Sequence, residues 1–330
     1  MWFLRSLAFV IFMVSCFMIG ELSNAGPSPI SKKITVSPSG DGDFRTITEA
    51  IEQGVPQNNN NWIQILVMPG IYNEEVKVPR DKPFIIIEGT GKDKTFVNWN
   101  GNIVFSDASI QVLASNFAAK QITFKNTYNH AIEKNDFERK PAVAASIEGD
   151  KIFFSDCGFI GVQDTIFDYS GRHYFQNCYI EGAVDFIFGN GQSIYEGCNI
   201  NVTAGLTGAT PGYLTAQRRD KPDESTGFVF KSCNILGTGP TYLGRAYGTY
   251  SRVIYYKCDI SVSVVPEGWD AWESKGKENT ITYVESGNTG PGSDTSKRVP
   301  WINKLSDDEV QKLVSMSFID ADGWLEGTPK

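Results

Sequence analysis

The sequence is poor in histidine and contains no Gly-x-Ser-x-Gly segment. Its two histidines, His130 and His173, both lie outside any segment typical of a serine hydrolase. A serine nucleophile on a strand-to-helix elbow is therefore excluded as the basis of a reaction. If the chain is an enzyme of acyl transfer, carboxylates must carry the chemistry.

An excess of positive charge is also lacking. Lysine and arginine number 30 against 38 aspartates and glutamates, so the formal net charge is −8. An acidic protein is not held electrostatically by a polyanion, and we therefore expect no nucleic-acid partner and weak retention on acidic polymers.

Long apolar runs are absent except for one near the start. Leu7 to Ile19 follows Arg5 and precedes Ser23-Asn24-Ala25, a small-x-small cleavage pattern. The run is too short to span a bilayer and no second run follows, so residues 1–25 are predicted to be a secretory signal peptide and no membrane partner is expected. Residues 26–330 are then expected to form a single secreted domain.

Cysteine is sparse but regularly placed. An aromatic-x-x-Cys unit occurs five times, and the second residue after the cysteine is isoleucine in four copies and Phe159 in the first. The intervals between cysteines are 21, 20, 35 and 25 residues: Cys157, Cys178, Cys198, Cys233 and Cys258. A short apolar strand repeating every 20 to 25 residues without a helical period predicts a solenoid of stacked β coils. The five thiols are interpreted either as a buried ladder or as partners of disulfides between neighbouring coils, such as Cys157 with Cys178.

Two aspartates stand one repeat apart in the segment 161–191. Asp164 and Asp185 are 21 residues from each other and both adjoin apolar residues. Equivalent positions of successive coils lie about 4.8 Å apart, so the two carboxyls should be neighbours on one face. Two carboxyls this close cannot both ionise freely, so the pKa of one should rise while that of the other stays low. Such a pair can supply an acid and a nucleophile from the same residue type. The alternative is that both are turn residues satisfied by backbone amides.

These segments carry a family resemblance. GVQDT at 161 and GAVDFIFGN at 182, followed by YLGRAYGTYSRV at 242 and PEGWDAW at 266, resemble the plant pectin methylesterases, and the likeness runs from near Ile34 to about Trp324. It implies an all-β fold, a right-handed parallel β-helix with short capping helices at both ends. It also implies a secreted cell-wall enzyme that removes C6 methyl esters from homogalacturonan, without a cofactor. We expect a form without the inhibitor-like pro-region that many members carry, and the resemblance implies a proteinaceous inhibitor as a further partner.

The resemblance assigns roles residue by residue. Asp185 matches the nucleophile, Asp164 the general acid and later base, and Gln163 a donor to the oxyanion. Arg245 matches the arginine that pairs with the nucleophile and contacts substrate. The alternative for Arg245, which lies near Tyr242 and Tyr247 in the sequence, is simple stacking on a surface ring.

Aromatic side chains are expected to line the cleft, because sugar rings pack their C–H faces on them. The candidates are Phe167, Tyr247, Trp269 and Trp272, and Tyr247 and Trp269 are favoured because they lie inside matching motifs. Tyr247 stands where the family usually has tryptophan, which predicts an altered preference rather than loss of binding.

One departure bears on catalysis. Pro141 stands where members of the family usually have a glutamine, and the resemblance implies that this glutamine is a second oxyanion donor. Loss of one such donor typically costs about 2.7–4 kcal/mol. The alternative function is therefore a pectin-binding wall protein with weak or no turnover. Polygalacturonases and pectate lyases are also β-helical, but the Gly-His-Gly of the former and the calcium-binding carboxylates of the latter do not appear.

Four peripheral features complete the interpretation. Residues 43–55 predict an amphipathic helix covering the first coil, with Gly40 to Asp43 as turn and N-cap rather than a calcium loop. A capping box at Ser306 predicts a helix over 307–317. Residues 128–140 are expected to form a surface loop, and Asn201 is a glycosylation sequon. Covered ends predict a monomer.

Overall fold

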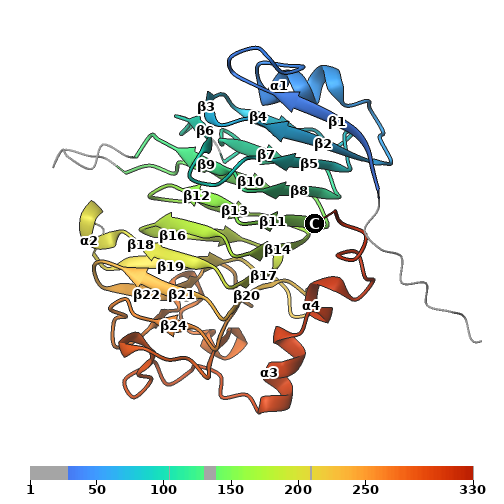
Figure 1. Cartoon of the computed structure of the whole chain (residues 1–330). Helices are drawn as coiled ribbons and strands as arrows, with labels where there is room; N and C mark the ends of the chain where they lie inside the picture. Colours follow the sequence, from blue (N-terminus) through green and yellow to red (C-terminus); the bar gives the residue numbers. More distant parts are fainter. Residues whose placement is uncertain (1–28, 104, 130–138, 209, 330) are drawn as a thin grey trace, which may run out of the picture.

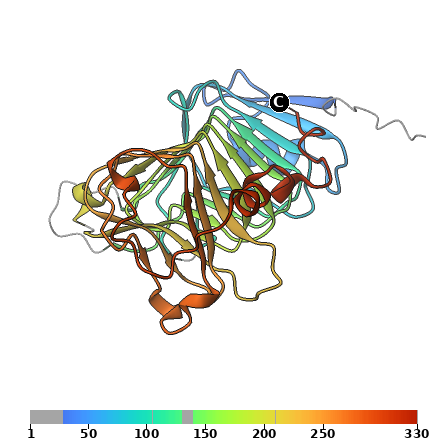
Figure 2. The same ribbon diagram turned by 90° about the horizontal axis from the view of Figure 1, so that it is seen from below.

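The computed structural model describes residues 29–103, 105–129, 139–208 and 210–329. The predicted signal peptide and most of the surface insertion, including His130, lie outside the described residues. The described chain winds through three parallel sheets, A, B and C, in repeated coils that stack along one axis (Figures 1 and 2). The predicted parallel β-helix is confirmed.

Sheet A has ten described strands, in register from coil to coil. They are β1 (Ile30–Val36), β2 (Trp62–Val67), β5 (Ile85–Glu88), β8 (Phe117–Lys120), β11 (Ile152–Ser155), β14 (Arg172–Gln176), β17 (Gln192–Glu196), β20 (Gly227–Lys231), β23 (Arg252–Tyr256) and β26 (Thr282–Ser286).

Sheet B follows sheet A in each coil and has eight described strands. They are β3 (Gly70–Asn73), β6 (Thr95–Trp99), β9 (Thr123–Asn126), β12 (Gly158–Ile160), β15 (Tyr179–Gly182), β18 (Asn199–Val202), β21 (Asn234–Gly237) and β24 (Asp259–Ile260).

Sheet C closes each coil and also has eight described strands. They are β4 (Val76–Val78), β7 (Ile110–Val112), β10 (Ala145–Ile147), β13 (Ile166–Asp168), β16 (Val184–Gly189), β19 (Gly212–Gln217), β22 (Thr241–Ala246) and β25 (Trp269–Asp270).

The cysteine repeat marks the turn from sheet A to sheet B. All five thiols are free and buried, which selects the ladder over the disulfides. The residue before each cysteine has a positive φ of 52–64°, the left-handed conformation of a sharp turn. The aromatic of each unit points into the core, where Phe175 stacks on Tyr195 with centroids 4.4 Å apart. Ladders of identical side chains thus fill the interior because successive strands stay in register.

The N-terminal helix is shorter than predicted. It comprises α1 (Ile47–Glu49) and a π-helical turn, η1 (Ala50–Gly54). Ile47, Ala50 and Ile51 enter the core as expected. The N-cap is Thr46 rather than Asp43, because the Asp43 carboxylate instead accepts from the Thr35 amide at 2.8 Å.

The C-terminal helix is confirmed with its capping box at Ser306, but it ends earlier than predicted. α3 (Asp307–Val314) is followed by a separate short helix, α4 (Ser317–Asp320). Val310 and Val314 pack with Ile194 and Ile254 on the outer face of sheet A. The two helices therefore lie along the wall of several coils, beside β20 and β23 for α3 and beside β14 and β17 for α4 (Figure 1).

Further short elements punctuate the later coils. They are α2 (Ala204–Thr207) and the 3₁₀ turns η2 (Trp272–Ser274), η3 (Glu278–Thr280) and η4 (Pro291–Ser293). None of the helices in the described part of the chain has the length and apolarity needed to cross a bilayer.

Candidate active site

The two sequence-predicted aspartates meet on sheet C. Gln163 bridges Val184 in parallel, and the amide of Asp164 donates to the Val184 carbonyl at 3.0 Å. Ile166 and Ile187, each two residues after one of the aspartates, are paired in the sheet. Asp164 and Asp185 therefore occupy equivalent positions of adjacent coils. The predicted neighbourhood is confirmed.

Both aspartates have a strained backbone. Asp164 has a φ of 63° and Asp185 a φ of 48°, and the register of β16 with β19 shifts between Val184 and Ile187. A non-glycine residue in the left-handed region costs of order 1–3 kcal/mol and persists only where the surroundings enforce it. Such a bulge re-aims a side chain out of the ladder, which suits a functional position.

Arg245 binds Asp185 from two coils away. Arg245 lies on β22, and its Nε donates to Asp185 Oδ1 at 2.7 Å while its Nη2 donates to Oδ2. The guanidinium carbon lies 4.3 Å from the centroid of the Tyr213 ring and 3.8 Å from that of Trp272. The arginine therefore stacks on rings, but on Tyr213 and Trp272 rather than on Tyr242 or Tyr247, and in addition makes a bidentate ion pair with Asp185.

The two carboxyls differ in acidity. Burial and the charge of Asp185 together raise the pKa of Asp164 well above its usual range, with Arg245 only partly opposing the rise. Burial also raises the pKa of Asp185, against the lowering effect of its hydrogen bonds and charge pairing with Arg245. The expectation that one pKa would stay low is thus wrong, because Asp185 is only 8% exposed. The order nevertheless holds: Asp185 ionises before Asp164.

A cavity of about 270 Å³ opens above this pair. It is lined by Phe105, Gln163, Asp164, Asp185, Phe188, Ala216, Tyr247, Trp272 and Glu273. Gln163 is half-buried and its side-chain amide makes no hydrogen bond within the described residues, so it is available to a ligand. The four residues predicted to carry catalysis are therefore brought together, with Arg245 reaching the cavity through Asp185.

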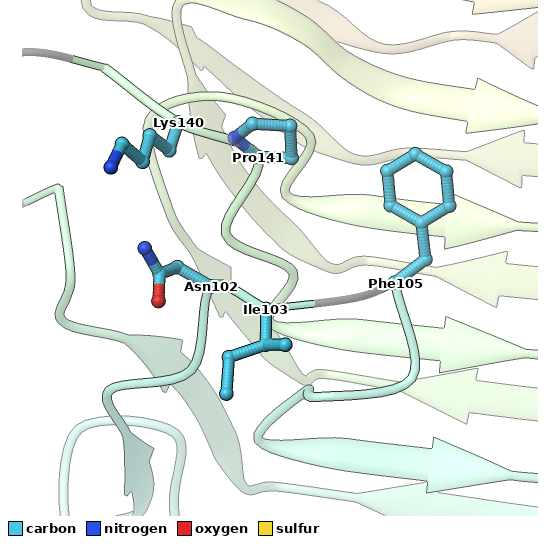
Figure 3. Close-up of a pocket in the computed structure, with 5 residues that line it drawn as sticks. All are labelled: Asn102, Ile103, Phe105, Lys140 and Pro141. Atoms are coloured by element: carbon cyan, nitrogen blue, oxygen red, sulfur yellow. The ribbon is translucent and has the colours of Figure 1, made fainter.

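Pro141 borders a second, apolar cavity next to the first. This cavity, of about 400 Å³, is lined by Asn102, Ile103, Phe105, Lys140 and Pro141. Figure 3 shows the proline ring in view between Lys140 on one side and Phe105 on the other. Pro141 therefore contributes an apolar surface to this cavity, and Phe105 lines both this cavity and the one above the carboxyls.

Of the aromatic candidates, Tyr247 is placed in the cavity and Trp269 is not. Tyr247 stacks on Trp272 with centroids 5.6 Å apart, and both rings line the cavity. Trp269 is 1% exposed, lies on Tyr283 at 4.2 Å and donates from Nε1 to Glu285. Its assignment as a substrate-binding residue is wrong. Side chains alternate along a strand, so Trp269, paired with Gly244, points inward while Arg245 points outward.

Phe167 supports the cavity without lining it. Its ring stacks on Phe188 at 4.6 Å and contacts Phe105 at 5.0 Å, and these two rings form the cavity wall. Phe188 was missed, although it stands three residues after Asp185 as Phe167 does after Asp164. Phe105 and Glu273 were also missed, and no motif marks either of them.

The remaining polar candidates lie away from the cavity. His173 is fully buried, with Nδ1 2.6 Å from Asp168 and Nε2 2.8 Å from the Gly149 carbonyl, so it has a structural role. Asn201 is on β18 of sheet B and donates to Tyr179 and Glu181. Its glycosylation stays a prediction. The described residues contain no cluster of three or more side chains able to hold a metal ion.

The site is thus an outward-facing carboxyl pair with an arginine on a parallel β-helix. Comparison with known proteins specifies the class of protein. The model of the Pectinesterase family matches residues 33–322. The chain is 46% identical to "Probable pectinesterase 29" of Arabidopsis thaliana over 319 residues, covering 95% of each, and 46% identical to "Probable pectinesterase 55" of the same plant.

Solved structures agree. The chain is similar to the pectin methylesterase from carrot with a TM-score of 0.82 and 32% identity, covering 93% of this chain and 98% of that one. It is similar to the pectin methylesterase of Aspergillus niger with a TM-score of 0.77 and 25% identity, covering 92% and 99%. The chain belongs to the Pectinesterase family.

Proposed function

We propose that this protein hydrolyses the C6 methyl esters of pectin, with Asp185 as nucleophile and Asp164 as general acid and base. The observation that carries the proposal is the bidentate Arg245–Asp185 pair beside a carboxyl whose pKa is raised well above its usual range. When Asp185 is ionised and Asp164 still holds its proton, this arrangement supplies a nucleophile and an acid in one cavity. Membership of the Pectinesterase family supports the same reaction.

In the first half of the reaction Asp185 attacks the ester carbonyl carbon. A carbon–oxygen bond to Asp185 forms, and the carbonyl oxygen becomes an oxyanion that the free amide of Gln163 is placed to stabilise. The bond to methoxide then breaks, and Asp164 delivers its proton so that methanol leaves. The product of this half is an acyl-enzyme on Asp185.

In the second half water replaces methanol. Asp164, now ionised, takes a proton from water as the hydroxyl attacks the same carbonyl carbon. Asp185 leaves as a carboxylate and the galacturonic acid is released, with Asp164 protonated again. Arg245 stabilises the carboxylate of Asp185 at the start and at the end of this cycle.

The experiment that tests the function is methanol release from highly methylesterified pectin by the secreted protein and by its Asp185→Asn variant. The proposal expects release by the native protein and a loss of at least 10³-fold in the variant, as for removal of other nucleophiles. Pectin binding without methanol release by either protein would leave the alternative of a binding protein that Pro141 has disabled, and equal release by both would show that Asp185 is not the nucleophile.

We further propose that the protein is secreted to the cell wall and acts as a monomer. The N-terminal pattern at residues 1–25 supports secretion. The monomer is supported by the short elements that cover part of the solenoid, α1 with η1 at its start and α3 with α4 along sheet A. A proteinaceous inhibitor and glycosylation at Asn201 stay proposals from the family likeness and the sequon. Mass spectrometry of the secreted chain tests cleavage and glycosylation together.

A further inference from the structure

The catalytic cavity continues into a polar cavity on the side of Tyr247. This second cavity, of about 400 Å³, is lined by Arg218, Asp220, Tyr247, Thr249, Glu273 and Ser274. Tyr247 and Glu273 line both cavities, so the two are parts of one groove. A polymer whose ester lies over Asp185 would place a neighbouring sugar unit here.

The charges lining this side of the groove are paired except for one. Arg218 donates from Nε to Asp220 at 3.0 Å, and Arg245 is paired with Asp185. Glu273 is exposed and makes no hydrogen bond or ion pair with any other residue that the structure describes. Its carboxylate therefore adds an uncompensated negative charge at the junction of the two cavities.

The backbone around Glu273 is held in place. Trp272 stacks over the Arg245 guanidinium at 3.8 Å, and its amide donates to Asp270 at 2.9 Å. Ser274 is 2% exposed and its hydroxyl donates to the Gly248 carbonyl at 3.3 Å. Because both neighbours are anchored, the backbone of Glu273 is held at the groove, which its side chain lines.

We propose that Glu273 selects against an ionised galacturonate unit in the polar cavity, so that the enzyme acts where the neighbouring unit still carries its methyl ester. The inference rests on the proposed function. Each sugar of the substrate is either a neutral ester or a carboxylate, and like charges at a few ångströms repel. A carboxylate produced by one turnover disfavours the next turnover beside it. Demethylation on this side of the groove is then scattered rather than contiguous.

The test compares two substrates prepared from one pectin. One is highly methylesterified and the other is partly de-esterified at random with alkali, and kcat/KM is measured from methanol release per ester at low ionic strength. The variant is Glu273→Gln, which removes the charge and keeps the shape. The matched control is Glu326→Gln, the same change at an exposed residue near Trp62 on the far sheet A.

The native protein and the control should prefer the highly methylesterified pectin. In Glu273→Gln the ratio of the two kcat/KM values should fall by a factor of about 2–5, the size of a partly screened charge interaction. The difference in this ratio between the native protein and Glu273→Gln should shrink in 0.5 M NaCl, where the Debye length is only about 4 Å. An unchanged ratio, or an equal fall in Glu326→Gln, overturns the role of Glu273 while methanol release leaves the proposed function intact. Absence of methanol from both substrates overturns the proposed function itself, and this inference with it.

Discussion

Arg245 donates its Nε to Asp185 Oδ1 at 2.7 Å although the strands that carry the two residues, β22 and β16, are separated by β19. The long side chain spans one intervening coil, where the small Ala216 leaves room between Phe188 and Arg245 in the register. Asp185 and its cation are therefore held together by the stacking of three coils rather than by one loop.

Replacing Arg245 should affect the charge of Asp185 directly. In Arg245→Ala the hydrogen bonds and positive charge that lower the pKa of Asp185 are lost while its burial remains. The pKa of Asp185 should rise further, and since activity falls as this carboxyl is protonated, the acid limb of kcat/KM should move to higher pH. Arg245→Lys retains the charge without the bidentate contact, so its acid limb should lie between those of the native protein and of Arg245→Ala. An acid limb that does not move in either variant would contradict the pairing.

Asp164 should cost stability at neutral pH. Its pKa in the folded state is raised well above the value of about 3.9 expected for the unfolded chain. The native state then binds the proton of Asp164 more tightly than the unfolded chain does. The contribution of Asp164 to the free energy of unfolding is therefore fully present below the unfolded pKa and is lost as the pH rises through the folded pKa. Asp164→Asn should therefore unfold at a higher temperature than the native protein at pH 8 and at the same temperature near pH 3. Thermal unfolding at both pH values measures this, and a variant less stable at pH 8 would refute it.

Restoring the amide at position 141 should raise activity. Pro141 borders an apolar cavity and offers no donor to an oxyanion. One donor is worth about 10²–10³ in rate when nothing replaces it, so Pro141→Gln should increase kcat by tenfold or more. Pro141→Ala removes the ring without adding a donor and serves as the control. Equal kcat values in the two variants would indicate that the lost glutamine is already compensated.

The two neighbouring tryptophans should behave differently. Trp269→Ala empties a fully buried site and should destabilise the fold by about 3–5 kcal/mol, as judged by denaturant unfolding. Trp272→Ala removes a ring from the cavity and from Arg245, and should raise KM and lower kcat with a smaller effect on stability. The opposite pattern would restore Trp269 as a substrate contact.

The contrast between these tryptophans shows where sequence reasoning ends. The spacing of Cys157 and Cys178 predicted the coils, because register keeps identical residues in one ladder, and the same spacing placed Asp164 beside Asp185. Trp269 and Trp272 are three residues apart where the chain leaves β25 for a 3₁₀ turn. Which of the two rings faces the core depends on how β25 pairs with β22, and the local sequence does not show this pairing.

The raised pKa of Asp185 has a similar origin. Sequence suggested an arginine partner, and the partner is present. How strongly burial raises the pKa of Asp185 against the effect of Arg245 depends on rings from other coils, such as Tyr213 and Trp272, which contact the arginine. Phe105 reaches the cavity from the loop between β6 and β7, where it contacts Phe167 and Phe188. That loop carries no repeat signature, so the sequence did not mark Phe105.

The pH dependence of kcat/KM for methanol release, in the native protein and in Asp164→Asn, tests the carboxyl pair most directly. A bell is expected for the native protein, rising as Asp185 ionises and falling as Asp164 loses the proton it must give to methanol. The variant should be slower by about 10²–10⁴ and should lack the falling limb. A variant that keeps both the rate and the falling limb would show that Asp164 is not the acid.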